Sequence, residues 1–288
     1  MIGNLTQRLF SEQPTETLYH YTSLSGVLGI VDSGQLRASD IRFMNDSAEL
    51  RHTLDLLRDQ VTRRIVAGTD RPDLLNQLLR WLSHRMVSGP MLFGASFRAN
   101  GNLLSQWRGY SAHGKGVSLG FNPGVILECA RGQRFHVGRC IYDPGEQHQL
   151  IEKIVDSVEQ TAGELSLQGP SPPVDAVFEH VEEDLLRIAA ILKHPAFEEE
   201  QEWRLISPAI RSPGNAAVNF REGSSMLVPY YAFGLVAPGR AGLALDHVYL
   251  GPTGNRELSM TSLELYLTRN HARPAAGISY CDIPFRQR

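Results

Sequence analysis

Apolar residues recur at helical spacing in several segments of the chain. Leu24, Val27, Leu28 and Val31 lie three or four positions apart, and Gly34 follows them as a helix stop. The same spacing predicts longer amphipathic helices in four further segments, with apolar stripes at 50–65, 74–82, 150–158 and 177–192.

Short runs rich in β-branched and aromatic residues predict strands between these helices. They lie at 19–21, 36–43, 91–97, 116–121, 135–142, 202–207, 226–231 and 247–251. Strands and helices interleave irregularly, which favours an α+β fold with a central, mostly antiparallel sheet split by helical insertions. We expect a single domain over residues 1–288, with a helical insertion at about 145–195 and a Pro-rich loop at 167–174 inside it.

The composition is that of an ordinary folded chain, with 42% apolar and 20% charged residues. Its 28 basic and 31 acidic side chains leave a net charge of −3, which argues against a chain-wide electrostatic grip on nucleic acid or on an anionic membrane. The three cysteines cannot all pair and form no CxxC motif, as expected in a reducing compartment. No run is apolar enough for a membrane span or a signal peptide, so we expect a cytoplasmic protein.

Motifs of established spacing for metals and nucleotides are absent. The ten histidines are scattered without HExxH or HxH, so no bound metal is expected. A phosphate-binding loop of the Walker type, a dinucleotide fingerprint and a GxSxG nucleophile elbow are missing as well. Chemistry must therefore come from less familiar groupings of residues.

The first such grouping is the run Tyr19, His20, Tyr21 and Thr22. A short strand here delivers His20 to one face, directly before a helix that Thr22 or Ser23 can cap. The alternative is a histidine packed beneath that helix with a structural role.

The second grouping is the acidic segment at 198–207. Alternation along a strand predicts that Trp203 and Leu205 face the core, while Glu200, Glu202 and Arg204 share the other face. Two neighbouring carboxylates raise each other's pKa, and an adjacent arginine opposes that effect. The alternative is a solvated acidic turn with a surface ion pair.

The third grouping places Gln106, Trp107, Arg108 and Tyr110 within five residues. Aromatic, amide and guanidinium groups together can stack on a base and bind a phosphate. The alternative makes Trp107 and Tyr110 core anchors and leaves Arg108 exposed. A capping box formed by Asp46 and Glu49 explains those two acids without any function.

These segments together resemble a bacterial family catalogued only as a domain of unknown function. The motifs that carry the resemblance are HYTS at 20–23, NDSAE at 45–49, SFRANGNLLSQWRGYS at 96–111, GVSLGF at 116–121, FEEEQEWRLIS at 197–207 and VYLGP at 248–252.

The order of the motifs is also similar to that of ADP-ribosyltransferases. That superfamily has a His or Arg on its first core strand, a Ser or Tyr on a middle strand and a Glu on a late strand. His20 and Glu202 match the first and last positions, and Ser96 matches the middle one, with Tyr110 as its rival.

This resemblance implies an enzyme that cleaves the N-glycosidic bond of NAD, with NAD as substrate. Glu202 would stabilise the developing positive charge and Glu200 would activate an acceptor, either protein or nucleic acid. His20 would contact the ribose and nicotinamide. The other residues implied at NAD are Tyr21, Thr22, Ser96, Gln106, Trp107, Arg108, Tyr110 and Arg204. Small bacterial enzymes of this kind act as toxins or in anti-phage defence.

Two other classes remain open. A nucleotide- or nucleic-acid-binding module without chemistry would use Trp107, Arg108 and Tyr110 as a stacking platform. A metal-dependent hydrolase or nuclease would use carboxylates as ligands, namely Asp46, Glu49, Glu200 and Glu202.

Overall fold

One open sheet organises the chain. A computed structural model describes residues 2–44, 47–110, 116–167, 174–212, 214, 217–223, 225–240 and 242–283. Its strands are β1 (Leu18–Ser23), β2 (Gln35–Asp40), β3 (Phe93–Arg98), β4 (Gly116–Phe121), β5 (His136–Arg139), β6 (Glu202–Ile206), β7 (Val218–Glu222), β8 (Leu227–Gly234), β9 (Leu245–Leu250) and β10 (Ile278–Tyr280). They follow the order β10-β9-β4-β1-β3-β2-β8-β7, and β6 pairs with both β3 and β5.

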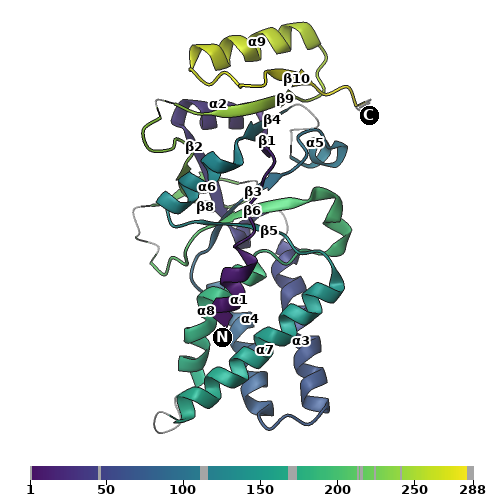
Figure 1. Ribbon diagram of the computed structural model, residues 1–288, viewed down its shortest axis with the longest axis vertical. Coiled ribbons are helices and arrows are strands. Elements are labelled where there is room, and N and C mark those ends of the chain that lie inside the picture. The colour runs from purple at the N-terminus through teal and green to yellow at the C-terminus, as the bar shows by residue number, and fades with distance from the viewer. Residues whose placement is uncertain are drawn as a thin grey trace.

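The described helices lie around this sheet. They are α1 (Ile2–Leu9), α2 (Leu24–Ser33), α3 (Ser47–Val66), α4 (Pro72–Ser88), α5 (Leu104–Tyr110), α6 (Pro123–Gly132), α7 (Pro144–Leu167), α8 (Val174–Ala189) and α9 (Arg256–Arg269), with short 3₁₀ helices η1 (Ile41–Phe43) and η3 (Pro195–Glu200). Helices α1, α3, α4, α7 and α8 gather at one end of the molecule, and α9 covers the opposite end (Figure 1). The predicted insertion at about 145–195 contains α7 and α8.

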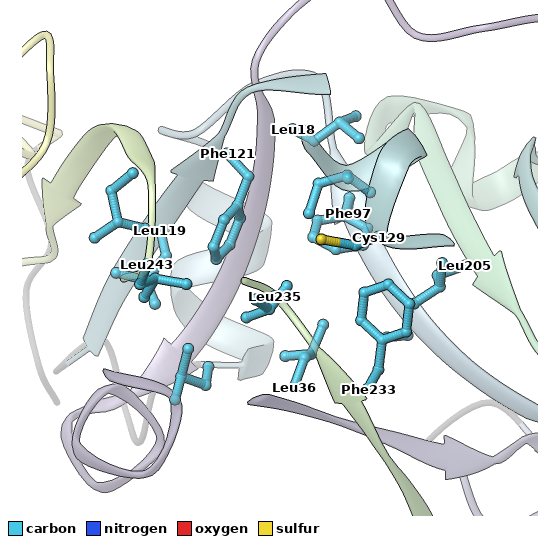
Figure 2. Close-up of a cluster of buried hydrophobic side chains, with 14 of the residues drawn as sticks. Leu18, Leu36, Phe97, Leu119, Phe121, Cys129, Leu205, Phe233, Leu235 and Leu243 are labelled. Atoms are coloured by element: carbon cyan, nitrogen blue, oxygen red, sulfur yellow. The ribbon is translucent and has the colours of Figure 1, made fainter. Parts of the chain in front are cut away.

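Two hydrophobic cores result. The first joins the sheet to α2, α6 and α9, and Figure 2 shows part of it, where the rings of Phe97 and Phe121 meet edge to face at 6.1 Å. The second lies among the gathered helices and reaches the sheet at Ile206. Within the described ranges, each helix is too short or too polar to cross a bilayer.

The predicted class is confirmed as a mixed fold with a mostly antiparallel sheet, in which β9 and β10 form the parallel pair. Each amphipathic stripe corresponds to a helix, namely α2, α3, α4, α7 and α8. The strand predicted at 36–43 ends earlier, because the Asp40 side chain accepts a hydrogen bond from the Arg42 backbone and starts η1. The sequence pattern did not predict helix α9, because its leucines do not form a single apolar stripe: Leu265 is exposed and Leu267 is buried.

The sheet splits along one edge of β3. Strand β6 pairs with β3 from Gly94 to Arg98 and occupies one edge. The other edge is shared, since β2 pairs at Phe93 and Gly94 whereas β1 pairs only at Arg98. Between them the backbone of β3 around Ser96 lacks a neighbouring strand, and α2 connects β1 to β2 across this opening. The split therefore exposes main-chain and side-chain groups of β3 beneath a helix.

The turn after α2 fixes this geometry and gives a testable pair of variants. Gly34 caps the helix with a positive φ of 64°, and a Cβ there would also meet Val236 at 3.1 Å. Gly34→Ala should lower the free energy of unfolding by about 1–2 kcal/mol, the cost of a left-handed residue with a side chain. Gly29→Ala, where a Cβ would meet nothing within 4 Å, should raise it by about 0.5–1 kcal/mol. Chemical denaturation of both variants measures the contrast, and equal effects would contradict it.

Candidate functional site

A cavity of about 610 Å³ opens at the split of the sheet. Its wall includes the first turn of α2, represented by Ser25 and Gly26, and parts of β2 and η1, represented by Arg37 and Phe43. The residues predicted for a site that also line it are His20, Tyr21, Thr22, Ser96, Gln106 and Arg204. Residues from three separate motifs of the sequence are thus brought to one place.

His20 and Ser96 are in direct contact. The Nδ1 atom of His20 lies 3.0 Å from the backbone oxygen of Ser96, and a carbonyl oxygen can only accept, so Nδ1 carries the proton. Burial lowers the pKa of His20, the hydrogen bond to Ser96 opposes this, and the nearby charge of Arg98 lowers the pKa further. The ring is therefore neutral at pH 7, with Nε2 as a hydrogen-bond acceptor. His20 satisfies the β3 carbonyl that the split leaves without a strand partner.

Glu202 lies beneath the cavity and does not line it. Its Oε1 accepts from Arg204 Nε at 2.8 Å, while its Oε2 lies 2.6 Å from Lys193 Nζ and 3.4 Å from Arg98 Nη1. The carboxylate is fully buried. Burial alone raises the pKa of Glu202, but the three cations outweigh it and hold the pKa well below its usual range.

Glu200 reaches the same cations from a different element. Its Oε2 accepts from Arg98 Nη2 and from Lys193 Nζ, each at 2.6 Å. The prediction that Glu200 lies on the strand with Glu202 is wrong, because Glu200 ends η3 and Gln201 then takes a positive φ of 39°. The alternative of a solvated acidic turn is also wrong, since both carboxylates are buried. The predicted faces of Trp203 and Arg204 are confirmed.

The described lining of the cavity is cationic. Five basic side chains line it, and its described members include no carboxylate: Arg37, Arg98, Lys193, Arg204 and Arg221. Three of them are at most 3% exposed and form the ion cluster with the two glutamates, whereas Arg37 and Arg221 lie nearer solvent on β2 and β7. The described lining can hold an anion, because its five positive charges outnumber the two negative charges of Glu200 and Glu202.

The aromatic platform predicted on α5 does not form. Trp107 is fully buried, packs edge to face on Tyr21 at 4.9 Å, and its Nε1 donates to Asn102 Oδ1. It is a core anchor, as in the alternative considered above, and the prediction that Trp107 stacks on a ligand is wrong. Arg108 is exposed and lies outside the cavity lining, so its predicted contact with a ligand there is not formed.

Tyr21, a predicted ligand contact, makes hydrogen bonds within the protein. Tyr21 OH donates to Asn100 O and accepts from Leu103 N, so the hydroxyl serves the loop before α5. The side chains of Tyr110 and Glu49 and the whole of Asp46 fall outside the described residues.

Sequence reasoning missed Arg98, Lys193, Arg37 and Arg221 as members of the site. Lys193 gave the clearest signal, because it directly follows the apolar stretch from Ile188 to Leu192 and becomes 1% exposed. A lysine buried there requires a carboxylate partner.

Among the described residues, His, Cys, Asp and Glu side chains nowhere gather in a group of three that could hold a metal ion. The oxygens of Glu200 and Glu202 are already engaged by Lys193 and two arginines. A set of this kind does not fit a metal ion without displacement of those cations.

One comparison with known proteins covers part of these segments. The model of a family described as a protein of unknown function, DUF2971, matches residues 106–205, which run from Gln106 to Leu205. The predicted resemblance to a domain of unknown function is thus confirmed for this segment. Neither the curated proteins nor the solved structures contain a match.

The buried carboxylate generates a stability prediction. Glu202→Gln removes one partner of a buried cluster and leaves its cations uncompensated, so the free energy of unfolding should fall by about 3–5 kcal/mol. Glu198→Gln, a matched change on an exposed side chain nearby, should change it by less than about 0.5 kcal/mol. Urea unfolding monitored by circular dichroism measures both. Similar small effects for the two variants would show that the cluster contributes nothing.

The same cluster predicts a pH dependence. Because the folded pKa of Glu202 lies below its ordinary value of 4.5, its stabilising contribution is complete above that pH and is lost as the pH falls through the folded pKa. The difference in unfolding free energy between wild type and Glu202→Gln should be constant near pH 7 and shrink in acid below pH 4.5. Denaturation at a series of pH values tests this, and a gap that persists unchanged at pH 3 would contradict it.

Proposed function

We propose that the cavity binds NAD and that the protein is an ADP-ribosyltransferase-like enzyme. The observation that carries the proposal is the cationic lining beside a neutral His20. NAD contains a pyrophosphate, which suits arginine and lysine side chains, and ribose hydroxyls, which suit an imidazole acceptor. We therefore assign the cationic side chains and His20 to the binding of a single ligand.

The placement of the ligand follows from these groups. Ribose next to nicotinamide lies against His20, where a hydroxyl donates to Nε2. The phosphates lie against the buried cations or the first turn of α2 at Ser25, where the helix dipole favours negative charge. The N–H of Gly26 in that turn already donates to the Ser23 hydroxyl. The three motif residues of the resemblance support this arrangement, since His20, Ser96 and Glu202 stand on β1, β3 and β6, which are neighbours in the sheet.

Transfer chemistry requires a carboxylate near the ribose. In the reaction the bond between ribose C1′ and the nicotinamide nitrogen breaks, neutral nicotinamide leaves with both electrons, and positive charge develops on the ribose. Glu202 carries the matching charge, but its oxygens are held by Lys193, Arg98 and Arg204. We therefore assign turnover to a state in which ligand phosphates draw Lys193 or Arg98 away and Glu202 becomes available.

Binding without turnover is the second candidate function, and the same engaged carboxylate favours it. A module that only holds a nucleotide needs the cationic lining and His20, and it needs Glu202 solely to position the cations. Release of nicotinamide distinguishes the two candidates, because only the enzyme breaks the glycosidic bond.

The binding proposal predicts selective effects of the two outer arginines. Isothermal titration of wild type with NAD should give saturable binding that weakens as salt is raised. Arg221→Gln and Arg37→Gln should each weaken it severalfold, because each removes one positive charge from the lining that attracts the pyrophosphate. Arg58→Gln, which changes an exposed arginine on α3, should have no effect. Absence of NAD binding by wild type overturns the proposal.

The turnover proposal predicts that wild type releases nicotinamide from NAD, detected by chromatography, once an acceptor is supplied in cell extract. His20→Ala should reduce the release by about 100-fold, since misplaced ribose is costly for the reaction. Saturable NAD binding without nicotinamide release over a long incubation would contradict the enzyme proposal and favour the function of binding without turnover.

A further inference from the structure

Gln106 differs from the other buried glutamines of the described chain. It stands on α5, lines the cavity and is 2% exposed. No hydrogen bond joins its side-chain amide to any other described residue. Gln147 donates to the backbone oxygens of Ile141 and Lys193, each at 2.7 Å, and half-buried Gln133 bonds Gly234 through both ends of its amide.

The amide of Gln106 opens onto the cavity. It is not among the described side-chain atoms that are both fully enclosed and unpaired, such as Arg98 Nε and Ser118 Oγ. Its two N–H donors and its carbonyl acceptor are therefore available to a molecule in the cavity. Because Gln106 lines the cavity, a ligand in the cavity can supply the missing partners.

The position of Gln106 indicates which part of a ligand it meets. Tyr21, next to His20 on β1, packs against Trp107, next to Gln106 on α5. Gln106 therefore belongs to the end of the cavity that contains His20, on the opposite side from Arg37 and Arg221 of β2 and β7, since β1 and β2 lie on either side of β3 in the sheet order.

We infer that Gln106 is a specificity residue that pairs with a primary carboxamide on the ligand. Two such amides form a pair of antiparallel N–H···O hydrogen bonds, in which each group donates once and accepts once. In NAD the matching group is the carboxamide of nicotinamide, so this inference rests on the proposed function. A site built to hydrogen-bond a group rejects ligands that lack it.

The test compares two ligands that differ by nicotinamide. NAD and ADP-ribose are titrated separately into wild type, Gln106→Leu and Gln149→Leu, the last being the same change at an exposed glutamine. Gln106→Leu should weaken NAD binding about tenfold or more and leave ADP-ribose binding within about twofold. Gln149→Leu should change neither.

Each other outcome overturns the inference in a distinguishable way. Equal weakening of NAD and ADP-ribose binding would show that Gln106 contacts the ADP-ribose part that the two ligands share, or that it determines the shape of the cavity. Unchanged NAD binding by Gln106→Leu would show that Gln106 does not contact the carboxamide of nicotinamide. If wild type fails to bind NAD at all, the proposed function falls and this inference falls with it.

Thermal unfolding of the ligand-free variants provides an independent readout. Gln106→Leu should keep or raise the melting temperature, because the substitution removes a buried polar group that has no protein partner to lose. Gln147→Leu should lower the melting temperature by several degrees, since it removes one hydrogen-bond donor from each of the backbone oxygens of Ile141 and Lys193. A comparable loss in Gln106→Leu would assign Gln106 a structural role.

Discussion

Glu202 and Glu200 are held below the cavity by three buried cations, Lys193, Arg98 and Arg204. Removing charges from water costs several kcal/mol per ion, so each member requires the others to remain in place. The members come from β3, β6, η3 and the segment after α8, and Arg204 also donates to the backbone of Ala190. The cluster thereby fixes the gathered helices against the sheet.

Strands β1 and β2 share one edge of β3, and the opening between them gives access to this cluster. A continuous strand beside β3 would close the opening, whereas the split leaves the Ser96 carbonyl to His20 and places α2 above. The same cations that neutralise the carboxylates then line a cavity at this opening. The described cluster has three buried cations for two buried carboxylates, and guanidinium groups match the geometry of both carboxylates and phosphates. In the proposed function, ligand binding would therefore use the same side chains that hold the cluster together.

Local pattern was sufficient for part of this structure. The stripes of α2, α3, α4, α7 and α8 and the alternation along β6 depend on neighbours in sequence, and so they were predictable. The roles of Trp107 and Glu200 were not, because Trp107 is buried by Tyr21, which lies 86 positions earlier, and Glu200 is engaged by Arg98, which lies 102 positions away. His20 and Ser96, which motif order had grouped, are in contact, but motif order did not reveal that the oxygens of Glu202 are occupied.

We propose that the cluster and the split in the sheet together form a phosphate-binding cavity. A crystal structure of the protein with ADP-ribose bound tests it most directly. We expect phosphate oxygens within hydrogen-bond distance of at least one of Arg98, Lys193 and Arg204, with a ribose hydroxyl donating to His20 Nε2. Phosphates bound outside the cavity, with the three cations in contact only with Glu200 and Glu202, would contradict it.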